Sequence, residues 1–338
     1  MENIFEKVLV TGASGYIALH CILELLKEGY KVKGSLRDLN REDEVRKSLG
    51  TEFDKGKLEF CKLNLLDDAG WEAAASDCDF LLHIASPCFI EEPKNEKELI
   101  DPALEGTLRA LKAAQKSKIK KVVLTSSMGA IAYGHSKSIC DHNDWTDINQ
   151  DVGAYIKSKT IAEKAAWDFV DNLSDETFAL TTIHPGMVFG PLLSNDTEGI
   201  SASLIKKMIT GKFPALPDIY FTVVDVRDIA KLHVKSLKKK ESNHKRIIAT
   251  SEKAISFLEI SKILRELGFN KAPQKLVPTK LINSLAIFNK EMKTTSLMIK
   301  RGFYCSDISE TTLLYNWEPI PFKKTLEDMT ISLKKIIL

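Results

Sequence analysis

A tyrosine and a lysine four residues apart are the side chains of this sequence best suited to moving a proton. Tyr155 precedes Lys159, and on a helix this spacing puts both side chains on one face. A nearby ammonium lowers the pKa of a phenol from its ordinary value of about 10. We therefore expect the pair to exchange a proton with a substrate oxygen near neutral pH.

The same spacing occurs a second time, at Tyr133 and Lys137. Gly134 follows this tyrosine directly, and the surrounding residues lack a helical apolar stripe. The stretch from Tyr155 to Val170 instead carries Ala, Ile, Trp and Phe at helical spacing. The sequence therefore predicts that only Tyr155 and Lys159 share a helix face.

The elements that must position this pair alternate between strands and helices. Strands are predicted at Lys7–Val10, Tyr30–Leu36, Leu58–Leu63, Asp79–Ala85, Lys121–Ser126, Ala179–His184 and Arg246–Thr250. Helices are predicted at Tyr16–Glu28, Glu42–Leu49, Trp71–Ser76, Glu96–Ser117, Tyr155–Asn172 and Asp225–Lys238. Several strands are near-continuous apolar runs, as expected of strands covered on both faces. The pattern predicts an α/β fold, a Rossmann-type doubly wound parallel sheet with strand order near 3-2-1-4-5-6-7.

The character of the chain changes after His184, where prolines punctuate short elements. We expect a smaller C-terminal substrate-binding lobe, with residues 222–250 returning to the main sheet and a last amphipathic helix at Leu326–Ile337 docked on the lobe. The predicted domains are residues 1–185 with 221–252 for dinucleotide binding, and 186–220 with 253–338 for the substrate.

Composition excludes several classes of function. The formal net charge is +2 over 338 residues, so no global field favours nucleic acid or an anionic membrane, and the basic runs 116–121 and 235–245 are expected to be solvated helix ends. No apolar run approaches the roughly 18 residues that span a bilayer. The six cysteines lack a pairing pattern, which indicates a reducing, cytoplasmic location. A homodimer stays open, because helix faces are exposed.

A glycine-containing turn between the first strand and the first helix predicts a dinucleotide site. Glycines allow a tight turn and close approach of backbone N–H groups to a pyrophosphate, which then faces the helix N-terminus. Ala18 stands where a third glycine often sits. The candidate contacts in this turn are Gly12, Ser14, Gly15, Tyr16 and Ile17.

The end of the second strand predicts which dinucleotide binds. An acid there would bind a ribose 2′-hydroxyl, but this strand ends without one and Arg37 follows. A guanidinium can hold a 2′-phosphate with paired hydrogen bonds, so NADP (as NADPH) is favoured and NAD is the less favoured cofactor. The alternative is that Arg37 is a surface charge and Asp38 binds the ribose.

With these residues in place, the sequence resembles the extended type of the short-chain dehydrogenase/reductase superfamily, which includes the NAD-dependent epimerase/dehydratase family. Within it, the sequence is similar to the dihydroflavonol reductase-like group of plant and microbial carbonyl reductases. The motifs that carry the resemblance are Val-Thr-Gly12-Ala-Ser-Gly15-Tyr-Ile, Leu36-Arg37-Asp38, His83-Ile-Ala-Ser86-Pro, Glu105-Gly-Thr107, Val123-Leu-Thr-Ser-Ser127, Tyr155-x-x-x-Lys159, His184-Pro-Gly-Met-Val-Phe-Gly-Pro191 and Val226-Arg-Asp-Ile-Ala.

The resemblance implies a role for each matching residue. Ser127 would be the catalytic serine beside Tyr155 as general acid, and Lys159 would hold the nicotinamide ribose and lower the tyrosine pKa. Arg37 would bind the 2′-phosphate. Further cofactor contacts would be Asn64, Leu65, Ile84, Ala85, Ser86, Pro185, Gly186, Met187, Val188 and Ser203. Asn64 departs from the aspartate usual in the family, which weakens the expected affinity more than the assignment.

Two departures bear on the substrate. Ala132 replaces the asparagine of plant dihydroflavonol enzymes, and the residues around Tyr155 lack the cinnamoyl-CoA reductase signature. We therefore expect a microbial-type reductase that acts on a small-molecule aldehyde or ketone. The alternatives are an NAD-dependent nucleotide-sugar epimerase or dehydratase, and a dinucleotide-binding redox sensor without catalysis.

Other clusters of residues give weaker evidence for a functional site. His135, Cys140, Asp141 and His142 fit no common zinc spacing, so no metal is expected and a polar loop over the site is favoured. His20, His83 and His184 are expected to be packed and hydrogen-bonded. A final group of apolar residues fits a substrate pocket and the core of the lobe equally well; these are Trp145, Met208, Phe213 and Phe221.

Overall fold

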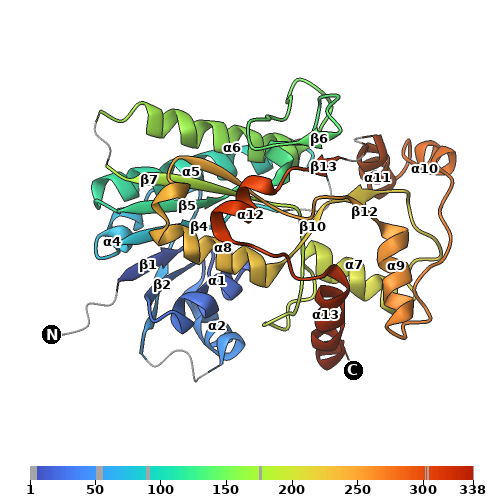
Figure 1. Ribbon diagram of the computed structural model, residues 1–338, viewed down its shortest axis with the longest axis horizontal. Coiled ribbons are helices and arrows are strands. Elements are labelled where there is room, and N and C mark those ends of the chain that lie inside the picture. Colours follow the sequence, from blue (N-terminus) through green and yellow to red (C-terminus); the bar gives the residue numbers. More distant parts are fainter. Residues whose placement is uncertain are drawn as a thin grey trace.

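The computed structural model describes residues 6–50, 56–88, 92–174, 177–300, 302 and 304–337. Figure 1 shows a sheet covered by helices on both faces, with a lobe of shorter elements beside the carboxyl ends of the strands.

The main sheet has seven strands in the order β3-β2-β1-β4-β5-β7-β11, and every neighbouring pair is parallel. The strands are β1 (Lys7–Val10), β2 (Lys31–Leu36), β3 (Leu58–Lys62), β4 (Phe80–His83), β5 (Lys121–Thr125), β7 (Ala179–Pro185) and β11 (Lys245–Ala249). The predicted order and Rossmann-type fold are confirmed. Each predicted strand is present, with ends that shift by one or two residues.

Helices cover both faces because the central strands are apolar on both sides; β4 and β5 are buried at every position. One layer contains α1 (Tyr16–Lys27), α2 (Glu42–Leu49) and α8 (Val226–Lys238). The other contains α4 (Trp71–Ala75), α5 (Lys97–Lys116) and α6 (Ala154–Asp171). Two separate apolar clusters fill the space on either side of the sheet.

The lobe has its own apolar core. Its helices are α7 (Ile200–Ile209), α9 (Phe257–Glu266), α10 (Thr279–Leu285), α11 (Lys290–Lys300) and α13 (Phe322–Ile337), while α12 (Ser309–Tyr315) lies against β11. Its short strands are β6 (Ile139–Cys140), β8 (Met187–Phe189), β9 (Tyr220–Phe221), β10 (Val223–Asp225), β12 (Ile255–Ser256) and β13 (Cys305–Ser306). Three short 3₁₀ turns complete the described elements, η1 (Leu39–Arg41), η2 (Met128–Ala130) and η3 (Lys240–Ser242).

Residues 222–250 return to the main sheet only in part. β11 joins it, as predicted, but β10 pairs with β8 in a separate two-stranded sheet. The reason is the chain direction after β7: Met187 N–H donates to Thr222 O (2.8 Å), which aligns the start of β8 with β10. The predicted last helix is present and begins earlier, at Phe322.

Packing corrects one expectation, for Lys121, and places three of the four apolar residues whose role was open. Lys121, placed in a solvated basic run, is buried at the start of β5 and donates to Lys239 O, Ser242 Oγ and Asn243 Oδ1. These acceptors satisfy the ammonium, which allows its burial. Among the four residues with two open interpretations, Met208, Phe213 and Phe221 pack in the core of the lobe.

No helix in the described part of the chain is long and apolar enough to cross a membrane.

Candidate active site

The carboxyl ends of β1 and β4 are joined by one threonine. The Oγ1 of Thr11 accepts hydrogen bonds from the N–H groups of Ile84 (2.9 Å) and Ala85 (3.0 Å) and shares a third with His83 Nδ1 (3.0 Å). Burial lowers the pKa of His83 to about 3, so the ring stays neutral. This cross-link holds the segment after β4 beside the glycine turn.

The glycine turn has the shape that a phosphate cradle needs. Gly12 has φ +70°, and a Cβ there would lie 3.0 Å from the Cβ of Ala85, so a larger residue would be strained and crowded. Gly15 precedes α1, whose first turn has no side-chain cap. The N–H groups at this helix end are therefore available to an anion.

Two arginines lie beside this turn. Arg37 is exposed directly after β2, as predicted. Arg41, one turn further on, donates from Nη1 to Ser14 Oγ (3.1 Å), and sequence reasoning missed it. The carboxylate of Asp38 accepts from Asn40 N–H (3.0 Å) and caps η1. This hydrogen bond uses one of the two carboxylate oxygens, so both interpretations of Arg37 and Asp38 stay open.

Ser127 lies just past the end of β5, in extended backbone at the start of η2. Its Oγ accepts a hydrogen bond from Gly129 N–H (3.0 Å), which orients the hydroxyl. The strand end before it is held to β7, because Ser126 N–H donates to Ile183 O (2.8 Å). The Ser127 hydroxyl lies close enough to Tyr155 to lower the pKa of the phenol, against the effect of burial.

The helix α6 presents Tyr155 and Lys159, as predicted. Its first N–H, from Ala154, donates to the carboxylate of Glu92 (3.0 Å), an arrangement favoured by the helix dipole. Lys159 is 8% exposed, and its Nζ lies 6.0 Å from the centre of the Tyr155 ring and 3.5 Å from Thr125 O. Ser127, Tyr155 and Lys159 are thus brought together beside the carboxyl end of β5, a central strand of the sheet.

The expected lowering of the tyrosine pKa is contradicted. Burial raises the pKa of Tyr155, with a further increase from the neighbouring Cys88, while the Ser127 hydroxyl opposes it. Burial also lowers the pKa of Lys159. At a distance of 6.0 Å from the ring, the ammonium does not offset the loss of solvent. Tyr155 is therefore held in its protonated form, the form that a proton donor requires.

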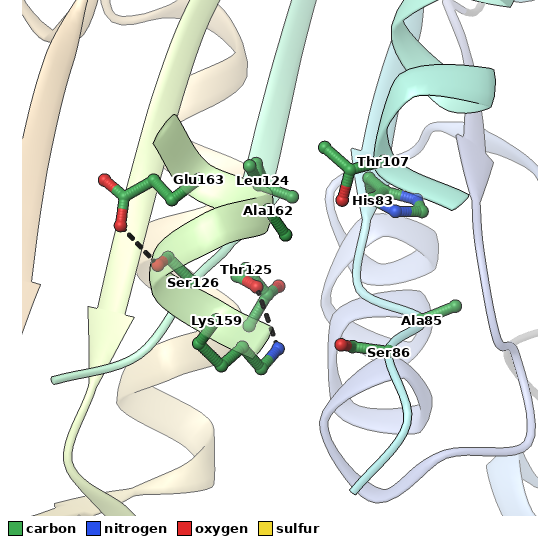
Figure 2. Close-up of a pocket in the computed structure, with 10 residues that line it drawn as sticks. All are labelled: His83, Ala85, Ser86, Thr107, Leu124, Thr125, Ser126, Lys159, Ala162 and Glu163. Carbon is green, nitrogen blue, oxygen red and sulfur yellow. Dashed lines mark hydrogen bonds between the residues drawn. The ribbon is translucent and has the colours of Figure 1, made fainter. Parts of the chain in front are cut away.

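Between α6 and the segment after β4 lies a small cavity of about 10 Å³, room for about one water molecule. Figure 2 shows Lys159, Thr125 and Ser126 on one side of it and His83, Ala85 and Ser86 on the other. Thr107 of α5 and Glu163 of α6 complete its polar lining.

The other predicted cofactor contacts lie in two places, next to the carboxyl ends of the strands and in the lobe. The segment Ile84–Ser86 is half-buried at the sheet edge, where Pro185 also ends β7. Gly186 follows, and a Cβ there would lie 2.0 Å from Thr250 Oγ1, so the bend has no room for a side chain. Met187 and Val188 continue into β8. Ser203 lies further away in the chain order, on α7 of the lobe.

Asn64 and Leu65 follow β3 at the far edge of the sheet. Asn64 Oδ1 accepts from Leu66 N–H (3.2 Å), so its side chain shapes its own turn. Leu65 packs against Gly106 of α5, where an added Cβ would lie 2.5 Å from Leu65 Cδ2. In the glycine turn, the hydroxyl of Tyr16 is buried without a partner in the described residues, and Ile17 packs on the core.

The histidines are packed as expected. His20 Nε2 lies 2.9 Å from Pro191 O, and His184 Nε2 lies 2.8 Å from both carboxylate oxygens of Glu163. Within the described ranges, no group of three or more His, Cys, Asp or Glu residues is placed to hold a metal ion. Trp145 lies under the guanidinium of Arg246, 3.8 Å from the ring centre.

This geometry agrees with the family model that the sequence matches. Residues 8–249 match the model of the NAD dependent epimerase/dehydratase family. The chain belongs to this family. The resemblance to the extended short-chain dehydrogenases and reductases is thereby confirmed.

Relatives and solved structures extend the match over most of the chain. Cinnamoyl-CoA reductase CAD2 of Medicago truncatula is 36% identical over 274 residues, which cover 79% of this chain and 82% of that protein. The NADPH-dependent methylglyoxal reductase GRE2 of Saccharomyces cerevisiae is 32% identical over 282 residues, covering 77% and 82%. The crystal structure of yeast methylglyoxal/isovaleraldehyde reductase Gre2 complexed with NADPH has a TM-score of 0.79 and 26% identity, and covers 97% of this chain and 98% of that one.

Proposed function

We propose that this protein is an NADPH-dependent reductase of aldehydes or ketones. The observation that carries the proposal is the convergence of Ser127, Tyr155 and Lys159 at the sheet edge next to the glycine turn. Relatives named as reductases, one of them NADPH-dependent, support it, as does a structural neighbour solved with NADPH.

The residues present fit NADPH. Gly12 and Gly15 have no side chains, so a pyrophosphate could approach the backbone at the uncapped start of α1. Arg37 and Arg41 would hold the 2′-phosphate, because both are cations beside the turn. Glu44 accepts from Arg41 Nε (2.8 Å) and Nη2 (2.9 Å), while Nη1 of the same guanidinium points to Ser14 in the turn. Lys159 would bind the nicotinamide ribose.

When bound, the cofactor supplies a hydride to the carbonyl carbon. The residues of this chain would bind and protonate the carbonyl oxygen of the substrate. Ser127 would donate a hydrogen bond to the carbonyl oxygen and place it against Tyr155, whose hydroxyl would transfer its proton as negative charge develops there. Lys159 would stabilise the tyrosinate left behind, and the product is an alcohol.

The test is oxidation of NADPH, and separately of NADH, against a panel of aldehydes, α-ketoaldehydes, α-ketoesters and aryl ketones. We expect turnover with NADPH preferred. Arg37→Ala and Arg41→Ala should each raise the KM for NADPH by about tenfold to a hundredfold, the value of a charge-assisted hydrogen bond, and change the KM for NADH little.

Arg46→Ala is the matched control, because its guanidinium lies over the Phe60 ring at 5.0 Å on the same helix segment. It should leave both constants within about twofold, as a surface substitution away from the ligand does. Equal effects on NADPH and NADH would overturn the 2′-phosphate assignment. Absence of turnover across the whole panel would overturn the reductase proposal and favour the epimerase and sensor alternatives.

A further inference from the structure

A buried carboxylate lies one helical turn beyond Lys159. Glu163 is 1% exposed, and its two oxygens receive hydrogen bonds from several directions. The donors are Ser126 Oγ (2.6 Å), His184 Nε2 (2.8 Å), Arg246 Nε (2.8 Å), Thr182 Oγ1 (3.2 Å) and Trp167 Nε1 (3.2 Å). So many donors keep a buried carboxylate ionised.

Four of these donors lie on β7 and β11 or directly after β5, and the fifth, Trp167, lies on α6 itself. Ser126 immediately precedes Ser127 at the end of β5, and His184 immediately precedes Pro185 at the end of β7. Arg246 on β11 extends the network, since its Nη1 donates to His142 O (2.8 Å) and Asp144 O (2.6 Å). Glu163 thus binds β7, β11 and the residue after β5 to α6.

The carboxylate also acts on the lysine through its charge, although its oxygens point to Ser126 and the lysine Nζ points to Thr125. Glu163 and Lys159 lie on one face of α6, four residues apart, and line the same small cavity (Figure 2). Burial alone would raise the pKa of Glu163, but the His184 ring and the Arg246 guanidinium lower it below its ordinary value. The cavity is therefore lined by a carboxylate and an amine.

We propose that Glu163 is a positioning residue for the reaction, which fixes the strand end carrying Ser127 and holds Lys159 in its protonated form. This inference rests on the proposed function, because Lys159 acts there as a cation. Burying a charged carboxylate costs desolvation free energy that a neutral side chain of the same shape would avoid. The proposed role gives this buried charge a function.

The other groups around Lys159 do not replace this charge. His83 of β4 is neutral, since burial lowers its pKa to about 3. Burial raises the pKa of the Cys88 thiol after β4, although Lys159 opposes this, and it raises the pKa of Tyr155 on α6 itself. Thr125 of β5 and Thr107 of α5 do not titrate. Arg246 is a cation behind the carboxylate. Burial lowers the pKa of Lys159, and Glu163 opposes that change.

The test is Glu163→Gln, which keeps the shape and removes the charge. Without the anion, the pKa of Lys159 falls, so we expect the alkaline limb of the kcat–pH profile to move down by about one unit. A heteronuclear NMR titration of the Lys159 side chain in cofactor-free protein should show the same shift. The NADPH Kd, from fluorescence, should stay within about threefold, since the charge lies behind the ribose site.

A second variant guards against loss of folding. Glu163→Gln with Arg246→Gln removes both charges, an exchange that buried pairs often tolerate. Our inference expects the same pH shift in this double variant, whereas a merely structural ion pair predicts a wild-type profile. Lys121→Met is the matched control, a buried charge at the opposite end of β5, and should lower the Tm with no shift in pH profile.

The outcomes separate the two proposals. If the wild-type protein turns over a carbonyl and the profiles of both Glu163 variants superimpose on it, the positioning role is wrong and the reductase proposal stands. If the wild-type protein turns over no carbonyl, both fall together, and the NMR titration then shows only an electrostatic contact.

Discussion

The protein contains two Tyr-x-x-x-Lys segments, and the fold treats them differently. Tyr155 and Lys159 lie on α6, with the lysine buried at the sheet edge. Tyr133 and Lys137 lie in turns and bends over the lobe side. There the lysine is 55% exposed and pairs with Asp144, and the tyrosine ring packs edge-on against Tyr304 at 5.3 Å.

The difference shows that spacing has chemical meaning only on a helix. A four-residue interval brings two side chains to one face when the backbone rises in 3.6-residue turns. Gly134 has φ +79°, a conformation that a helix cannot contain, so Lys137 turns away from Tyr133 and finds a carboxylate instead. Helical geometry and burial make the first pair a candidate for catalysis.

The sharpest way to break the comparison is to remove each tyrosine hydroxyl. Tyr155→Phe deletes the proposed proton donor, so kcat for carbonyl reduction should fall by about 100- to 10,000-fold, while the Kd for NADPH stays within about threefold. Tyr133→Phe should keep kcat within about threefold, because its hydroxyl lies outside the proposed relay. Steady-state kinetics with NADPH measure both, and a comparable loss in the two variants would show that the wrong pair was chosen.

The lysines provide a second, smaller contrast. Lys159→Met removes the cation proposed to stabilise the tyrosinate, and kcat should fall by about 10- to 100-fold, the value of a hydrogen bond to a charged group. Lys137→Met should leave kcat unchanged. Stopped-flow single turnovers would separate the chemical step from product release. An unchanged single-turnover rate in Lys159→Met would contradict the assignment.

Lys137→Met should instead change how the free energy of unfolding depends on pH in the acid range. Burial alone would raise the pKa of Asp144, but the hydrogen bond from Lys137 lowers it below its ordinary value. A carboxylate with a lowered native pKa stabilises the fold above its unfolded pKa of about 4, and this contribution is lost as the pH falls below it. The variant should therefore show a flatter acid limb in urea unfolding followed from about pH 6 to pH 2.5.

The smallest change in kcat is expected from a substitution of Gly134, although this substitution should lower the stability of the fold. A Cβ at Gly134 would lie 2.4 Å from Asp147 O, so Gly134→Ala should lower the free energy of unfolding by about 1–3 kcal/mol with kcat almost unchanged. Gly56→Ala shares the positive φ, +73°, but its Cβ would meet no atom of the described residues within 4 Å, so it should cost less. Equal losses in denaturant unfolding would mean that φ strain alone, and not the crowding, requires the glycine.

Local pattern was enough for much of this molecule. The apolar runs of β4 and β5 predict central strands because both faces are covered, and the glycine turn predicts a dinucleotide site because only small residues fit there. The lobe was predicted only as a region, since its short strands, such as β8 and β10, form by contacts between segments distant in the chain. No local period encodes such pairings.

The order of amino acids alone was sufficient for the sheet, its strand order, the family and the helix that carries Tyr155 and Lys159, since each depends on short-range periodicity and on motifs a few residues long. Tertiary packing decided the electrostatics. Lys121 was expected in solvent and is buried, the pKa of Tyr155 was expected to fall and is raised, and Glu163 binds partners from β7, β11 and the end of β5. The physical reason is that desolvation and charge pairing depend on every group within a few ångströms, and most of those neighbours are far away along the chain.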